Sequence, residues 1–154
     1  MKDLINLLHK GGYSLVVANG EICTFSGRGI SDLYRLLQED PGFLHGALVA
    51  DKVIGKAAAG LMIRGGVIEA YADTISTPAI ALLRENGVKV TFTEEVHHII
   101  NRTKDGWCPM EKACYELQSV DEICHAVQDK IRYYSTSSIL QCVHPKRERG
   151  KTPE

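Results

Sequence analysis

Two stretches of this chain carry side chains that could bind a ligand at the start of a helix. Gly55 and Lys56 precede an alanine-rich segment, and Ser76 precedes Thr77 and Pro78. A hydroxyl followed by proline is typical of a helix N-terminus. Free N–H groups there favour anionic or strongly polar ligands. If the preceding strands are neighbours, Lys56 would add a positive charge and Ser76 a hydroxyl to one crevice. The simpler alternative is that Lys56 is solvated and Ser76 only caps its helix.

A second set of reactive side chains lies between residues 101 and 111. Cys108 precedes Pro109 near a predicted helix start, where the helix dipole and nearby Arg102 or Lys112 would favour a nucleophilic thiolate. Glu111 could then act as a base. Asn101 and Arg102 suit a nucleotide-like ligand, because an amide can bond a base edge and a guanidinium a phosphate. Alternatively, Cys108 is a buried cap, Asn101 braces a loop, and Arg102 pairs with Glu111 or Asp105. The helix dipole alone could also account for Glu111.

A metal centre is not expected from the two adjacent histidines. His97 and His98 precede Cys108 in the chain, but neighbouring side chains in a strand point to opposite faces, and the spacing matches no standard zinc pattern. The sequence therefore predicts no metal ligand and no cofactor.

The composition argues against several classes of protein. The 154 residues are 44% hydrophobic and 24% charged, which is ordinary for one soluble domain, and the net charge of −1 offers no general attraction to nucleic acid or anionic membranes. The chain shows neither a signal peptide nor an apolar run of about 20 residues that could span a bilayer. Its five cysteines, an odd number, indicate free thiols. We expect a cytoplasmic protein with no DNA or membrane partner.

The elements that would position these residues alternate along the chain. Apolar periodicity and turn residues predict helices at 1–10, 30–38, 56–63, 76–86, from about 108, and at 121–134. Strands are predicted at 13–18, 21–25, 46–54 with an interruption at 51–52, 67–72 and 88–93. Asn19 and Gly20 suit a type I′ turn between the first two strands. This order favours an α/β fold, a three-layer α/β/α sandwich with a mixed sheet of about five strands.

One domain accounts for most of the chain. We assign it to residues 1–135, with a C-terminal helical extension from about residue 120. The tail at 136–154 is polar, carries both signs of charge near its end, and is predicted to be disordered.

Several motifs resemble those of a bacterial family named domain of unknown function 1893. They are residues 23–30, 51–59, 75–79, 100–102 and 108–112, within a span from about 15 to 117. The resemblance implies a cytidine deaminase-like fold, in which the active site lies between the N-termini of two helices. The crevice inferred from Lys56 and Ser76 is at the same place.

The chain departs from true deaminases at their zinc site. Those enzymes use His or Cys, then Glu two residues on, at one helix start and Pro-Cys-x-x-Cys at the other. Here the first position reads Lys56, Ala57 and Ala58, and the two cysteine positions are Ala79 and Leu82. Alanine and leucine cannot coordinate zinc, so the chain is not expected to be a zinc-dependent deaminase.

Three functions remain open, and so does the question of whether the chain is an enzyme. The first is a domain that binds a polar, nucleotide-like small molecule in a crevice lined by Gly55, Lys56, Ser76, Asn101 and Arg102. The second is a zinc-independent enzyme with Cys108 as nucleophile and Glu111 or a neighbouring histidine as base. The third is a structural module, a homo-oligomer built by the hairpin edge near Cys23 and the C-terminal helix.

Overall fold

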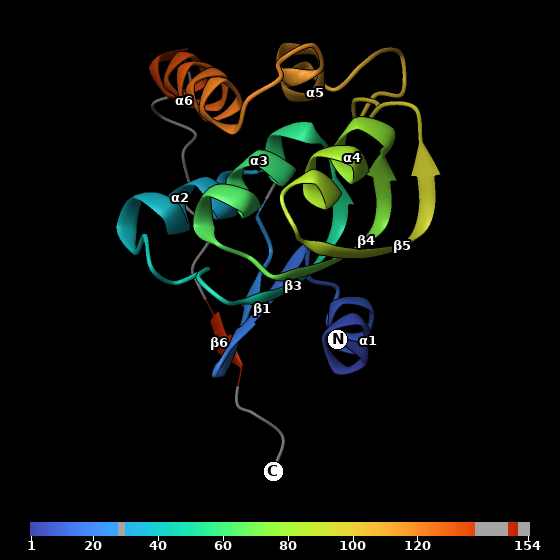
Figure 1. Cartoon of the computed structure of the whole chain (residues 1–154), viewed down its shortest axis with the longest axis vertical. Helices are drawn as coiled ribbons and strands as arrows, with labels where there is room; N and C mark the ends of the chain where they lie inside the picture. Colours follow the sequence, from blue (N-terminus) through green and yellow to red (C-terminus); the bar gives the residue numbers. More distant parts are fainter. Residues whose placement is uncertain (28–29, 138–147, 151–154) are drawn as a thin grey trace.

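A computed structural model describes residues 1–27, 30–137 and 148–150 (Figure 1). The helices are α1 (Lys2–Lys10), α2 (Ser31–Glu39), α3 (Lys56–Gly65), α4 (Thr77–Glu85), α5 (Pro109–Cys114) and α6 (Val120–Ser137). The strands are β1 (Leu15–Asn19), β2 (Glu21–Phe25), β3 (Leu48–Ile54), β4 (Glu69–Ser76), β5 (Lys89–Val96) and β6 (Glu148–Gly150). Every helix and strand predicted from the sequence is present.

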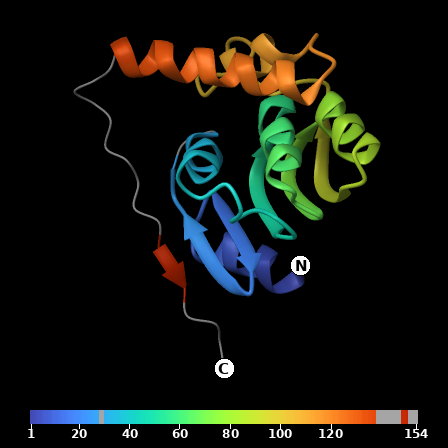
Figure 2. The ribbon, with the colours of Figure 1, turned by 60° about the vertical axis from the view of Figure 1, so that its left-hand side comes forward.

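The strands form one mixed sheet in the order β5-β4-β3-β1-β2-β6. β3, β4 and β5 are parallel, whereas β1 is antiparallel to both β2 and β3. Helices α2, α3 and α4 cover one face, α1 lies on the other, and α5 and α6 lie above α3 (Figures 1 and 2). The α/β class and the layered arrangement are confirmed. The five predicted strands are β1 to β5, and β6 pairs with the outer side of β2.

The third strand runs through Asp51 without the predicted interruption. Asp51 pairs with Leu15 of β1 and with Ala72 of β4, so partners on both sides hold its backbone in the sheet. A charged residue inside an apolar run indicated a break, but burial in the middle of a sheet outweighs that local preference.

The hairpin of β1 and β2 is confirmed, but its type I′ turn is wrong. A type I′ turn needs positive φ at two residues, and here Gly20 alone has it, at 78°. Asn19 stays in β1, and its side-chain amide donates hydrogen bonds to the carbonyls of Phe43 (2.8 Å) and His45 (3.1 Å). These long-range contacts hold Asn19 in the strand conformation.

Helix α3 is the centre of the helical layer. It contacts α2, α4, α5 and α6 as well as β3, and its residues from Lys56 to Met62 are all buried. Small side chains make this possible: a Cβ at Gly60 would lie 2.6 Å from Cγ2 of Ile123 in α6. The helix ends at Gly66, whose φ of 90° is the left-handed conformation that glycine favours.

The C-terminal part contains a long helix and a short strand. α6 extends to Ser137, past the predicted end at residue 134. Within the segment predicted to be disordered, Glu148–Gly150 form β6, and residues 138–147 and 151–154 lie outside the described part of the chain. Because β6 pairs with β2, the hairpin edge near Cys23 is not the free edge expected for an oligomer. None of the described helices is both long and apolar enough to cross a bilayer.

Asp51 is a buried acid in the middle of this sheet. Its exposed fraction is 8%, and burial raises its pKa from 3.8 to about 8, although hydrogen bonds from the N–H groups of Val53 and Lys52 lower it. The nearby carboxyl of Asp32 raises it further. The folded state therefore binds a proton that the unfolded state releases near pH 4, so stability should fall as the pH rises from about 4 to about 8.

Asp51→Asn should remove this pH dependence. The free energy of unfolding of the unsubstituted protein should lose up to about 1.4 kcal/mol per pH unit through Asp51, and the asparagine variant should gain on it steadily between pH 5 and pH 8. Urea unfolding at several pH values measures the difference. Asp129→Asn, at an exposed position of α6, is the control and should change little. A constant difference between Asp51→Asn and the unsubstituted protein would contradict the prediction.

Candidate functional site

A cavity of about 480 Å³ lies where β3 passes into α3. Its lining is mostly apolar. One wall comes from the β3–α3 junction, with Val53, Gly55, Ala57 and Ala58, and Ile30 stands beside it. The other wall is the chain from Ile99 to Thr103 and from Cys108 to Glu111. A volume of this size is typical of small-molecule sites.

The Glu111 carboxylate joins the two walls. Its exposed fraction is 1%, its Oε1 accepts a hydrogen bond from the backbone N–H of Lys56 (2.9 Å), and its Oε2 accepts one from the N–H of Ile99 (2.8 Å). The Lys56 N–H belongs to the first turn of α3, where Gly55 is the cap residue. The dipole of α3 favours a negative charge there. One side chain from α5 thus holds the start of α3 and the chain after β5 together.

Residues 99–108 form a small hairpin over the cavity. Ile100 pairs with Trp107, and Cys108 donates its N–H to the carbonyl of Ile99 (2.9 Å). In the turn, the Asn101 side chain donates to Asp105 (2.8 Å) and accepts from the Asp105 N–H (3.2 Å). Hydrogen bonds from Thr103 and Asn101 lower the pKa of Asp105. Asn101 therefore braces the loop, which was one of the two predicted roles.

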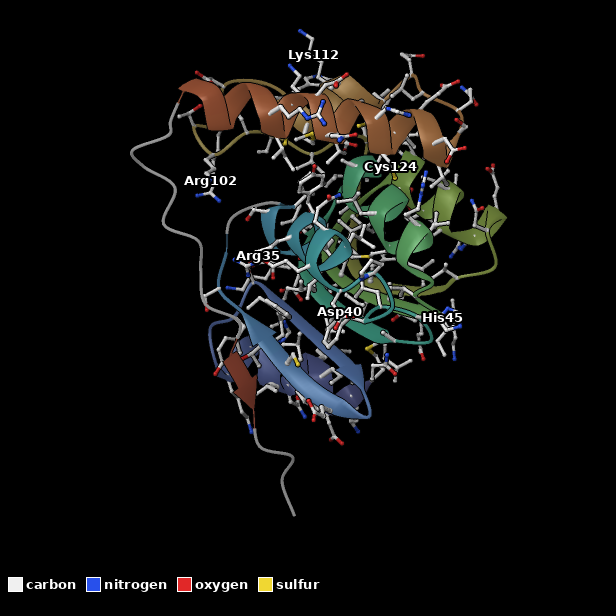
Figure 3. All side chains as sticks on the ribbon, turned by 90° about the vertical axis from the view of Figure 1, so that its left-hand side faces the viewer. Arg35, Asp40, His45, Arg102, Lys112 and Cys124 are labelled. Atoms are coloured by element: carbon white, nitrogen blue, oxygen red, sulfur yellow. The ribbon has the colours of Figure 1, made fainter. Side chains whose placement is uncertain are left out.

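Two further predicted residues lie in this hairpin and beside it. Arg102 is exposed and lines the cavity, and within the described part of the chain its guanidinium has no acidic partner. Figure 3 shows it projecting from the hairpin, away from α6. Cys108 is half-buried, caps α5 through its backbone and also lines the cavity. The alternative interpretation, an ion pair of Arg102 with Glu111 or Asp105, is therefore wrong for the described residues.

Lys56 and Ser76 do not line this cavity. Lys56 is 7% exposed, and its ammonium donates to the carbonyl of Tyr115 (2.8 Å), so it is not solvated. Ser76 is fully buried at the N-terminus of α4 but makes no side-chain cap. Among the described residues its hydroxyl has no hydrogen-bond partner. The strands β3 and β4 are neighbours, as the predicted crevice required. However, α5 and the chain after it cover Lys56.

An aromatic cluster holds the base of the hairpin. His98 stacks on Trp107 with ring centroids 3.9 Å apart, and Trp107 meets Tyr115 edge-on at 4.7 Å. His97 and His98 do not point to opposite faces, because β5 ends at Val96 and the chain bends there; their Nδ1 atoms lie 3.0 Å apart. In the part of the chain that is described, no three His, Cys, Asp or Glu side chains are grouped to hold a metal ion.

Five of the seven predicted site residues meet at one cavity: Gly55, Asn101, Arg102, Cys108 and Glu111. The sequence did not indicate the apolar lining. Val53 and Ile100 are 45% and 52% exposed at this site, and Ile68 is the other large apolar residue as exposed in the described chain. An exposed apolar residue and a core residue give the same signal in a hydrophobicity pattern, so the sequence did not single these positions out as part of a site.

The fold and cavity define a layered α/β protein with a small-molecule-sized site at the start of a helix. Residues 3–131 match the family model described as TM1506, domain of unknown function (DUF1893), and the chain belongs to that family.

The solved structures similar to this chain include a DUF1893 family protein from Thermotoga maritima. The two share 27% identity, with a TM-score of 0.77 over 84% of this chain and 88% of that one. A diaminohydroxyphosphoribosylaminopyrimidine deaminase/5-amino-6-(5-phosphoribosylamino)uracil reductase from the same organism is 16% identical, with a TM-score of 0.39 over 89% of this chain and 40% of that one. That score is too low to support an argument. No curated protein matches.

Replacing Glu111 should destabilise the fold. Glu111→Ala leaves the buried N–H of Lys56 and the part-buried N–H of Ile99 without an acceptor, which should lower the free energy of unfolding by roughly 2–5 kcal/mol. Urea unfolding measures the loss. Glu111→Gln retains one acceptor oxygen and should lose less free energy of unfolding. This variant can be measured if the alanine variant does not fold. Exposed Glu116 is the matched control; equal effects of Glu111→Ala and Glu116→Ala would show that the carboxylate is not a structural tie.

Proposed function

We propose that the cavity at the start of α3 binds a nucleotide-like small molecule. The observation that carries this proposal is the combination of an apolar cavity of about 480 Å³ with an exposed arginine in its lining. The flat faces of a heteroaromatic ring are apolar, so the ring would lie between the β3–α3 junction and the hairpin. Arg102 would bind the phosphate, for which a planar guanidinium is well suited.

The other polar groups of the cavity have more limited roles in this proposal. The Asn101 side chain is engaged in the turn, and its backbone N–H and carbonyl are bonded to Gly106 and Lys104, so Asn101 would shape the hairpin. Glu111 is committed to two backbone N–H groups and would position both walls. We expected Lys56 and Ser76 to contact the ligand. In this proposal they would affect the site only by holding α3 and α4 in place. We also propose that this site derives from a cytidine deaminase-like fold. It would have no zinc chemistry, because Lys56, Ala79 and Leu82 stand at the three ligand positions.

A thermal-shift series should test this function. A nucleoside monophosphate at 100 times its dissociation constant should stabilise the protein by about 2.7 kcal/mol, a shift of roughly 5–10 °C for a domain of this size. Arg102→Ala should weaken binding of the monophosphate by about tenfold or more, as expected for a lost bond to a charged group. Binding of the matching nucleoside should stay nearly unchanged.

Arg84→Ala, at the exposed end of α4, is the control and should bind both compounds as the unsubstituted protein does. If neither nucleosides nor monophosphates shift the melting temperature, the proposal fails and the structural module becomes the better account. If Arg102→Ala and Arg84→Ala behave alike, the phosphate does not lie at Arg102.

A zinc-independent enzyme with Cys108 as nucleophile is the second candidate. One observation favours it: Cys108 lines the cavity, whereas Cys23 and Cys114 are buried. Burial raises the pKa of Cys114 to about 11 and also raises that of Cys124. Cys124 is half-buried like Cys108, so it is the proper comparison. Alkylation of Cys108 that is faster than that of Cys124 and is blocked by a bound monophosphate would support the candidate; equal rates would count against it.

A further inference from the structure

A second cavity, of about 350 Å³, lies between α2, α3 and α6. Its apolar floor includes Leu37 from α2 and Leu61 from α3. Cys124 marks its position in Figure 3, on the side of α6 that faces α3. The first cavity uses the first turn of α3 and the second uses its last turns, so the two lie along the same helix.

The polar side chains around this second cavity can all donate hydrogen bonds. They are the Arg64 guanidinium, the His125 ring, the Tyr34 hydroxyl, the Cys124 thiol, and the amides of Gln38 and Gln128. Among the residues described at this cavity, none is acidic. This differs from the first cavity, where the buried carboxylate of Glu111 is part of the wall.

Arg64 is the charged group of this set. It lies in the last turn of α3 with its side chain 46% exposed, and it forms an ion pair with Asp121, which is 82% exposed. A guanidinium has five N–H donors in a planar fork, and the recorded contact with Asp121 joins one of its nitrogens to one carboxylate oxygen. The pair is exposed to solvent, and exposed pairs are weak. An anion in the cavity can therefore compete with Asp121 for Arg64.

We propose that this second cavity binds a small organic anion, with a carboxylate or phosphate on Arg64 and His125 and an apolar body on Leu37 and Leu61. The site is separate from the nucleotide-like site proposed above and does not depend on it. In this role α6 is one wall of a binding site as well as a cover for α3.

Titration of the full chain with benzoate and phenyl phosphate, followed by amide NMR shifts, tests this site. Both anions should shift signals of α2, the last turns of α3, and α6, and the neutral analogue benzyl alcohol should not. Arg64→Gln should weaken binding of both anions by about tenfold or more, because a bond to a charged group is lost. Asp121→Asn should strengthen their binding, because it removes the competing carboxylate.

Two matched variants make the test decisive. Arg84→Gln replaces an arginine at the same place in another helix, the last turn of α4, and should leave benzoate binding unchanged. Arg102→Gln affects only the first cavity and should also leave it unchanged. The proposal is overturned if neither anion binds at millimolar concentration, if Arg64→Gln matches Arg84→Gln, or if Arg102→Gln abolishes benzoate binding.

Discussion

The Glu111 carboxylate and its two hydrogen bonds connect parts of the molecule that are far apart in the sequence. The Lys56 N–H lies 55 residues away from Glu111 and the Ile99 N–H 12 residues away. A buried carboxylate is costly unless its oxygens are hydrogen-bonded, so the segment after β5 and helix α5 must both approach the start of α3. That approach forms the first cavity. The same contact explains why Glu111 is better placed to hold the walls than to exchange protons with a ligand.

The small residues of α3 are the second constraint on the fold. Alanine and glycine along this helix allow α6 to pack within van der Waals contact of its backbone, as the position of Gly60 against Ile123 shows. Because α3 is surrounded by other helices, it has no solvent-facing stripe along its first two turns, and its ends become the places where cavities open. Ala57 and Ala58 border one cavity, and Leu61 and Arg64 border the other.

The two cavities differ in the chemistry that they offer. The first has apolar walls, a thiol and one exposed cation, with its single buried carboxylate already bonded to the backbone. The second has donors around an apolar floor. Family membership, which the match over residues 3–131 shows, supports the fold and leaves both ligands to be determined from these site properties.

The sequence by itself determined the order and type of the elements, because apolar periodicity and turn residues are local signals. Pro109 opens α5, Asn86 and Gly87 close α4, and Gly66 closes α3. The tertiary structure decided that Lys56 bonds the Tyr115 carbonyl, that the Ser76 hydroxyl has no hydrogen-bond partner among the described residues, and which N–H groups bond to Glu111. Those outcomes depend on contacts between distant segments, which a local pattern does not encode. Five site residues could be predicted because each lies at or near an element boundary. The apolar lining could not be predicted, because Val53 or Ile100 gives the same hydrophobicity pattern whether it is exposed or buried.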